Sequence, residues 1–422
     1  VFGDAGDQNV IKCGSYVGNG SATGPEINLG WEPQWLLVKR TDSHDAWLIA
    51  DNMRGIVTGG NEALIRANEN SAEYSSNNRL SLRPDGFQVV DSNGDMNGNG
   101  GNYIYIAIRR PDGYVGKPPE LGTGVFAMDT GNGSSTIPNF DSGFPVDFAF
   151  TREPADTQNW YTSSRLTQGR QLYLDSTAAD GAYSALVFDS NAGWGKTTGF
   201  NSNWQSWMWK RHAGFTVCTW EGDGVTGRQI AHDLSKTPEM IWLKKRTGTA
   251  RNWPVYHKGL NGGSSPEDYV VWLNLTNAEA DESDIWNDTA PTSTHFTIGG
   301  GVNTNEDGEE YIAMLFASVD GISKVGYYDG SNSNQTITLG FTPRFFLCKS
   351  SSHSGSWLVL DSTRGFSTSW GSTSEALYLN TNAAESDLDI GRINSAGTGV
   401  FIKGGVSEIN EGGKSYIYYA HA

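Results

Sequence analysis

The residues of this chain that are able to do chemistry are scattered rather than grouped. Its 422 residues include seven histidines and three cysteines. No histidines have the H-E-x-x-H spacing of a zinc protease helix, and no cysteine pair has the spacing of zinc ligands. The sequence also lacks the G-x-S-x-G turn of serine hydrolases and the phosphate-binding loop of nucleotide-binding proteins. These observations argue against a structural zinc ion and a nucleotide site.

One segment before an aromatic strand has the pattern of a cation-binding loop. Asp91, Asn93 and Asp95 place oxygen-bearing side chains at every second residue, like the start of a calcium loop. The sixth position is Met96 rather than glycine, and the twelfth is Asn102 rather than glutamate. An ordinary Asn/Gly turn is therefore the alternative interpretation. Ca²⁺ at Asp91, Asn93 and Asp95 is a candidate, and we expect no other cofactor.

Paired carboxylates are the other pattern that could carry a reaction. A glycosidase needs two acids on either side of the scissile bond. Acid clusters occur at 279–284 and 306–310, but both lie among Asn, Gly and Ser, which is typical of solvated loops. Asp51 and Arg54 are three residues apart before a glycine, and we interpret them as a local pair that fixes a turn. We therefore expect a protein without catalytic residues, with depolymerisation of a polysaccharide as the enzymatic alternative.

Exposed aromatic rings are candidates for binding, because the apolar face of a sugar stacks on an aromatic ring. The chain contains 15 tryptophans. Those that recur at matching places, such as Trp47, Trp160, Trp253 and Trp357, are interpreted as core residues. Those that do not recur are the glycan-binding candidates. They are Trp194, Trp207, Trp286 and Trp370.

These residues are carried by a unit that repeats four times. Residues 29–55 align with 339–365 without a gap, including the match of Leu29-Gly30-Trp31 with Leu339-Gly340-Phe341. Two weaker copies lie between them. A proline-led apolar strand marks each copy, at Pro33, Pro145, Pro238 and Pro343, and these prolines are spaced by 112, 93 and 105 residues. The aromatic strands that close the units, beginning at 103, 204, 311 and 416, give the same period.

The pattern within each unit predicts an all-β protein of four tandem β-sandwich, jelly-roll-like repeats. Apolar runs of four to eight residues alternate with clusters of Gly, Asn, Ser and Asp, and no stretch has a helical period. A propeller blade would repeat at about 40–50 residues, so a propeller is the less favoured alternative. The predicted boundaries are an N-terminal arm at 1–13 and repeats at 14–116, 117–214, 215–321 and 322–422. The second repeat is the most divergent.

Composition excludes several classes of partner. Lys plus Arg number 30 and Asp plus Glu number 47, so the formal net charge is −17. Binding to nucleic acid requires a basic surface, and an anionic lipid surface would repel this chain. No apolar run approaches the roughly 18 residues of a membrane span. We therefore expect an acidic protein with no nucleic-acid partner and no membrane insertion.

The repeat unit resembles a known family. Its marks are the strand 27–39 with Leu29-Gly30-Trp31, the segment from Trp47 to Gly55, and the closing strand 103–110. This unit is similar to a repeated β-domain of tailed, often marine, bacteriophage virion structural proteins of the tail-fibre-like kind. The resemblance is closest in the first and fourth repeats and loose in the second. It implies no catalytic residues.

The resemblance implies a non-enzymatic structural protein on the surface of a virion, which is an extracellular particle. Tail fibre, spike and capsid-decorating protein are the positions it allows, with a contribution to host attachment. The partners it implies are the chain itself, as a possible homotrimer, other virion proteins and a host cell-surface glycan. A standalone carbohydrate-binding or adhesion module is the alternative from a different class.

Overall fold

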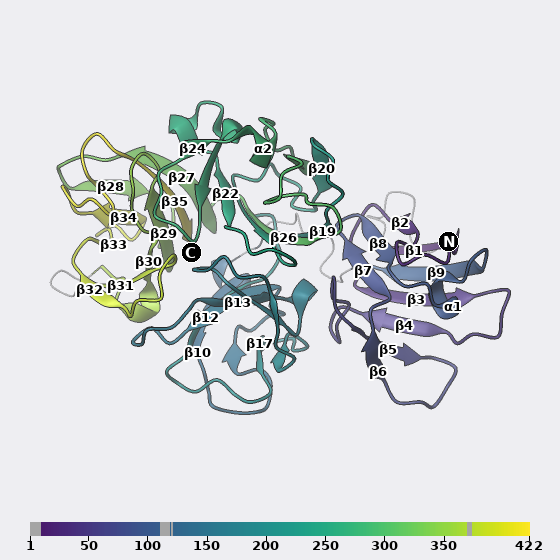
Figure 1. Cartoon of the computed structure of the whole chain (residues 1–422). Coiled ribbons are helices and arrows are strands. Elements are labelled where there is room, and N and C mark those ends of the chain that lie inside the picture. Colours follow the sequence, from purple (N-terminus) through teal and green to yellow (C-terminus); the bar gives the residue numbers. More distant parts are fainter. Residues whose placement is uncertain (1–9, 110–118, 120, 369–373) are drawn as a thin grey trace.

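The computed structural model describes residues 10–109, 119, 121–368 and 374–422. The chain is all β, and every pair of neighbouring strands is antiparallel. Four six-stranded sheets recur along the chain, and each is accompanied by a smaller sheet of two or three strands. The predicted fold class, four tandem β-sandwich repeats, is confirmed (Figure 1). No helix in the described part of the chain has the length and hydropathy to cross a membrane.

Repeats 1 and 2 consist of the following elements. The large sheet of repeat 1 contains, in spatial order, β1 (Ile11–Val17), β9 (Asn102–Ile108), β3 (Trp35–Arg40), β4 (Leu48–Asp51), β5 (Glu62–Arg66) and β6 (Tyr74–Asn77), and its small sheet contains β2 (Glu26–Asn28), β8 (Gly86–Val89) and β7 (Leu80–Arg83). The large sheet of repeat 2 contains β10 (Phe126–Thr130), β18 (Gln205–Trp209), β12 (Phe148–Arg152), β13 (Tyr161–Ser164), β14 (Arg170–Tyr173) and β15 (Gly181–Ala182), and its small sheet contains β11 (Phe140–Asp141), β17 (Gly193–Lys196) and β16 (Leu186–Val187).

Repeats 3 and 4 have the same order. The large sheet of repeat 3 contains β19 (Phe215–Glu221), β26 (Glu310–Phe316), β21 (Met240–Lys245), β22 (Pro254–His257), β23 (Tyr269–Trp272) and β24 (Ala280–Asp281), and its small sheet contains β20 (Arg228–Ala231) and β25 (His295–Ile298). The large sheet of repeat 4 contains β27 (Ser323–Asp329), β35 (Ser415–His421), β29 (Phe345–Ser350), β30 (Leu358–Asp361), β31 (Ser374–Tyr378) and β32 (Ser386–Leu388), and its small sheet contains β28 (Gln335–Thr338), β34 (Gly399–Ile402) and β33 (Gly391–Ile393).

Helices are short and connect strands. They are α1 (Gly94–Asn97), α2 (Ser283–Trp286) and the 3₁₀ turns Gly122–Gly124, Arg165–Thr167, Leu260–Gly263, Pro266–Asp268 and Ser362–Arg364. The first strand begins earlier than predicted. Residues 11–13, which the sequence analysis placed in an N-terminal arm, pair with β9 from Ile11 onward. Of the rest of the predicted arm, residues 1–9 lie outside the described part of the chain, and Val10 lies inside it.

Repeats 2, 3 and 4 bury both faces of their large sheets. Every residue of β12, β21 and β29 is buried, whereas a sheet with one solvated face would alternate. Alternate side chains enter the repeat's own sandwich, and the others enter a core that the three repeats share. Phe150, Trp242 and Leu347 are members of that shared core. Figure 1 shows the three sandwiches grouped around a common centre, with repeat 1 to one side. We call repeats 2, 3 and 4 the ring.

Three tryptophan hydrogen bonds close the ring in one direction. The indole N–H of Trp160 in repeat 2 donates to the Tyr378 carbonyl in repeat 4, at 2.9 Å. Trp357 in repeat 4 donates to the Trp272 carbonyl in repeat 3, at 3.0 Å, and Trp253 in repeat 3 donates to the Tyr173 carbonyl in repeat 2, at 3.0 Å. The prediction that these three tryptophans are core residues is confirmed. Each donor and acceptor occupies the same position of its repeat, so the ring has approximate threefold symmetry.

A cation on the second half of the proline-led strand follows the same cycle. Lys244 Nζ donates to the Thr177 carbonyl at 2.8 Å, and Lys349 Nζ donates to the Thr276 carbonyl at 3.1 Å. Arg152 of repeat 2 occupies the matching position and donates to the Ala383 carbonyl at 2.8 Å. Backbone bonds return across each junction. They are Asp180 N–H to the Arg246 carbonyl, Glu279 N–H to the Ser351 carbonyl and Glu385 N–H to the Pro154 carbonyl.

Repeat 1 is attached to the ring by the loop that follows β4. Thr58 N–H donates to the Leu166 carbonyl at 3.0 Å, and its hydroxyl pairs with that of Thr219 at 2.8 Å. Arg246 Nη1 donates to the Thr58 carbonyl at 2.9 Å. These contacts join repeat 1 to repeats 2 and 3.

A buried histidine at the junction of repeats 3 and 4 makes the ring sensitive to acid. Gly259 N–H donates to His257 Nδ1, so Nε2 carries the proton and donates to the Tyr418 carbonyl. Burial lowers the pKa of His257 from its ordinary value of 6.5 to about 3. The unfolded chain therefore binds a proton that the folded chain does not between these two values. Stability falls as the pH drops through this window.

We expect His257→Gln to reduce this dependence, because the amide keeps a donor toward Tyr418 and does not titrate. The slope of unfolding free energy against pH, measured by urea titration between about pH 6 and pH 4, should shrink by up to about 1.4 kcal/mol per pH unit. His44→Gln, which changes an exposed histidine, is the control and should leave the slope unchanged. Equal slopes for His257→Gln and the wild type would contradict the assignment.

Candidate functional site

The tryptophans chosen as glycan-binding candidates lie in different surroundings. Trp207 and Trp286 are buried core residues with no ring face open to a sugar. Trp194 is also buried, but it lines the pocket described below and stays a candidate. Trp207 points into the shared core and donates to Asp361 Oδ2 at 3.1 Å. Trp286 is held on α2 against Tyr256. The fourth candidate, Trp370, lies outside the described residues.

The calcium candidate is a helix cap that an arginine neutralises. Asn93 caps α1 by accepting from Asp95 N–H, and Asp91 accepts from Asn93 N–H. The buried Arg79 guanidinium lies 2.9 Å from an oxygen of Asp95 and 3.5 Å from one of Asp91. These contacts favour the turn over the cation loop, because the Arg79 guanidinium already balances the charge of both carboxylates. No cluster of three acidic, histidine or cysteine ligands occurs in the residues that the structure describes.

Asp51 and Arg54 have the local role that the sequence suggested, and Asp361 and Arg364 form the matching pair in repeat 4. Arg54 Nε donates to Asp51 at 2.6 Å, and Arg364 Nη2 donates to Asp361 at the same distance. The hydrogen bond that Asp361 receives from Trp207 adds a second function, because it joins repeat 4 to repeat 2.

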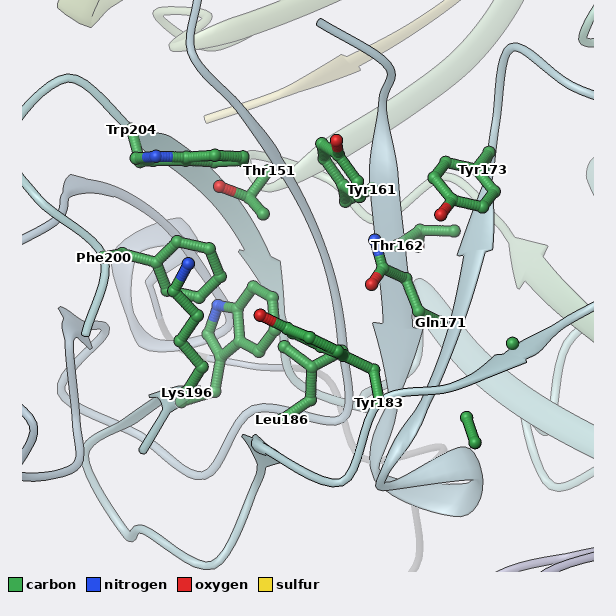
Figure 2. A pocket seen from close by; sticks show the side chains of 13 residues that line it. Thr151, Tyr161, Thr162, Gln171, Tyr173, Tyr183, Leu186, Lys196, Phe200 and Trp204 are labelled. Carbon is green, nitrogen blue, oxygen red and sulfur yellow. The ribbon is translucent and has the colours of Figure 1, made fainter. Parts of the chain in front are cut away.

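The clearest candidate site is a pocket of about 420 Å³ in repeat 2 (Figure 2). It lies where the large and small sheets of this sandwich separate. Strands β12, β13, β14 and β15 form one wall, and β16, β17 and the turn that follows β17 form the other. We call it the aromatic pocket. Its walls are lined by Thr151, Tyr161, Thr162, Gln171, Tyr173, Gly181, Ala182, Tyr183, Leu186, Trp194, Lys196, Phe200 and Trp204.

Six of the 13 lining residues are aromatic, and several of their rings support one another. Tyr161 lies between two rings, with centroid distances of 5.4 Å to Tyr173 and 5.5 Å to Trp204. Phe200 packs against Trp204 at 5.2 Å. Tyr183 is 38% exposed and stands across the pocket from Trp204, as Figure 2 shows. The rings are held by contacts with each other and with the core, so the pocket is formed before any ligand arrives.

Polar side chains supplement the rings, and Lys196 and Gln171 are the longest of them. The Lys196 ammonium lies 4.2 Å from the Phe200 centroid and 5.3 Å from the Trp204 centroid. Burial lowers the pKa of Lys196, and the nearby Glu153 carboxylate opposes this. Gln171 extends its amide into the space between the rings (Figure 2). The lining therefore offers hydrogen-bond donors and an acceptor beside flat apolar surfaces.

Polar residues in this pocket replace core residues of the other repeats. Strand register places Thr151, Tyr161 and Gln171 at positions that are buried and mostly aliphatic elsewhere. The counterparts of Thr151 are Val38, Leu243 and Cys348, those of Tyr161 are Leu48, Pro254 and Leu358, and those of Gln171 are Leu64, Val270 and Ala376. In repeats 1, 3 and 4 these positions fill the sandwich. In repeat 2 they line an opening.

This contrast is the signal that sequence reasoning missed. The aromatic pattern of repeat 2 predicts a closing strand that begins at Trp204. The structure places Trp204 just before that strand, β18, with its ring in the pocket. Polar substitutions at three positions that face the interior of one sandwich could have identified the site.

Residues 7–110 and 189–422 match the family described as Domain of unknown function (DUF7483). This match covers well over half of the chain, so the chain belongs to that family. The interval outside the match contains Tyr161, Gln171 and Tyr183 of the aromatic pocket, whereas Lys196 and Trp204 lie inside it. No curated protein shows significant similarity to the chain.

We expect millimolar Ca²⁺ to leave the thermal midpoint of the protein within about 1 °C of its value in chelator, because Arg79 competes for both carboxylates. Differential scanning calorimetry would measure this. Arg79→Met removes the competing cation, lowers the midpoint and should make it respond to Ca²⁺. If Ca²⁺ raised the thermal midpoint of the wild type by several degrees, the protein would bind Ca²⁺ and this expectation would be contradicted.

Proposed function

We propose that this chain is a non-enzymatic attachment protein that binds a glycan in the aromatic pocket of repeat 2. The observation that carries the proposal is the replacement of core residues by Tyr161, Gln171 and Thr151 around a preformed opening of about 420 Å³. An opening in the core costs packing energy, since buried side chains lose contacts on one side. Such a cost is expected where a ligand occupies the space.

The chemistry of the lining suits a sugar. Pyranose rings have one apolar face and a rim of hydroxyl groups. Trp204, Tyr161 and Tyr183 supply flat apolar surfaces, and small-molecule pockets typically combine such surfaces with a few polar groups that fix orientation. Gln171 and Lys196 are the polar groups here. The ammonium of Lys196 favours a sugar that carries a carboxylate or another anionic group.

The same lining gives little support to hydrolysis. A glycosidase needs two carboxyl groups across the scissile bond, about 5–10 Å apart. None of the 13 residues that line the pocket is an acid or a histidine. The pocket supports binding, and a depolymerase is the less favoured function.

The setting that we propose for this binding is the surface of a bacteriophage virion. The repeat unit resembles tail-fibre-like virion proteins, and tandem sandwiches suit a structural protein that presents a binding site. Fibre, spike and capsid decoration all fit this setting, with other virion proteins and a host surface glycan as partners. The standalone carbohydrate-binding module shares the pocket but would not be found in purified particles.

We expect Trp204→Ala and Tyr183→Ala each to weaken glycan binding by at least about tenfold, or about 1.4 kcal/mol, because each removes a stacking surface. Isothermal titration calorimetry with neutral and acidic oligosaccharides from bacterial surface polysaccharides would measure it. Tyr327→Ala changes a tyrosine of similar exposure, 46%, outside the pocket and is the matched control.

The wild type must bind at least one of these probes, and the control must bind it equally well. Binding that survives in both pocket variants, or no binding of any probe by the wild type, would overturn the proposed function. Release of reducing ends from the polysaccharide would instead favour the depolymerase.

A further inference from the structure

Repeat 1 has an apolar sheet face that the ring does not cover. On β9, the residues that enter the sandwich are buried, and those on the opposite side are not. Ile104 is 41% exposed and Trp47 is 37% exposed. The expectation that Trp47 is a core residue like its three counterparts is therefore wrong. We call this side of the large sheet the open face. It carries Trp35, Leu37, Lys39, Trp47, Ile49, Ile65, Ile104, Ile106 and Ile108.

The open face is the counterpart of the surface that builds the ring. The pair Leu37 and Ile106 has the same register as Phe150 and Trp207 in repeat 2. The equivalent pairs are Trp242 with Met314 in repeat 3 and Leu347 with Tyr419 in repeat 4. All six of those ring residues are buried in the shared core. In repeats 2, 3 and 4, this face of each large sheet is thus covered by the equivalent faces of the other two repeats. In repeat 1 the same face is uncovered.

Repeat 1 also keeps the hydrogen-bonding groups of a ring junction. Trp47 matches the three donor tryptophans, and no acceptor for its indole N–H occurs among the residues that the structure describes. The carbonyl of Arg66 matches the acceptors, because Arg66 pairs with Leu48 as Tyr173 pairs with Tyr161. Lys39 matches Lys244 and Lys349, but among the described residues its acceptors are the Arg40 and Ser43 carbonyls of repeat 1 itself. In repeats 2, 3 and 4 the equivalent indole donates to the carbonyl of a neighbouring repeat and not to that of its own repeat, so this donor and acceptor are suited to a second sheet of the same kind.

The contacts that attach repeat 1 to the ring leave the open face available. They include the segment from Met53 to Thr58, the small-sheet strand β7, whose Arg83 lies 4.0 Å from Glu221, and Glu32, whose carboxylate lies 2.8 Å from the Arg211 guanidinium. None of these residues is part of the open face.

We propose that three copies of this chain associate through the open faces of their first repeats around a threefold axis. The Trp47 indole N–H of each copy donates to the Arg66 carbonyl of the next, and Lys39 donates to the backbone beyond it. The arrangement repeats between chains the ring that repeats 2, 3 and 4 form within one chain. Head-to-tail contacts form a closed ring when the rotation between neighbouring subunits is a whole fraction of 360°. In the ring of repeats 2, 3 and 4, three copies of this surface form such a closed ring.

Light scattering after size exclusion tests this directly on the full chain. The expected mass is three times the chain mass of 45.8 kDa. A monomer, a dimer or a tetramer of the wild type would overturn the proposal. The monomer would indicate that a different protein covers the open face.

Variants of the open face locate the contact. Ile106→Asp places a charge where the three faces meet, and we expect it to give monomers at concentrations where the wild type is a trimer. The circular dichroism spectrum of this variant, and the temperature at which its ring unfolds, should match those of the wild type. Val302→Asp alters an apolar residue of repeat 3 that is 42% exposed, and this matched control should remain a trimer. A trimer that persists in Ile106→Asp would overturn the proposal.

A second variant separates the hydrogen bond from apolar association in general. Trp47→Phe keeps a large ring but removes the donor, once in each of the three junctions. We expect the concentration at which half of the chains are assembled to rise by about tenfold, consistent with three lost hydrogen bonds of ordinary strength. An unchanged midpoint would show that Trp47 does not make the proposed bond. Glycan binding by the aromatic pocket does not enter either measurement.

Discussion

A sheet that is apolar on both faces must find cover for both, and this requirement organises the whole molecule. Each large sheet uses one face for its own sandwich, and the small sheet behind it completes that core. The other face cannot remain in water without a large loss of hydrophobic free energy. In repeats 2, 3 and 4 the three second faces cover each other. Tandem repeats along the chain thus become a closed ring.

Directional hydrogen bonds determine which repeat faces which. An apolar contact alone would tolerate many orientations, but the indole N–H groups of Trp160, Trp253 and Trp357 each bond to one carbonyl that the neighbouring repeat presents at the correct place. An unpaired indole in this core would lose its hydration without compensation. The same logic applies to Lys244 and Lys349, whose ammonium groups end at backbone carbonyls of the next repeat. Polar bonds at the edge therefore fix the geometry of an apolar centre.

The sequence was sufficient for the repeat and for its strands, because the proline-led strand and the closing aromatic strand recur at one period. It was not sufficient for the ring, since nothing in a single strand shows what covers its second face. That gap explains the errors with tryptophan. Trp207 does not recur, yet it fills the shared core, whereas Trp47 recurs and is partly exposed. The aromatic pocket was missed for a related reason: Gln171 and Tyr161 are informative only once register shows which core residues they replace.

The ring also changes how the protein can vary. In an assembly of three identical chains, any substitution occurs three times, so a change that opens a core weakens all three subunits together. Here the three positions are encoded separately, and repeat 2 has polar residues where repeats 3 and 4 have filled interiors. The filled cores of repeats 3 and 4 stabilise the ring, although the opening in repeat 2 reduces its packing energy. The number of pockets follows from the same asymmetry. Repeat 2 carries the aromatic pocket, so the number of these pockets in an assembly is set by how many chains it contains and not by how many repeats each chain has.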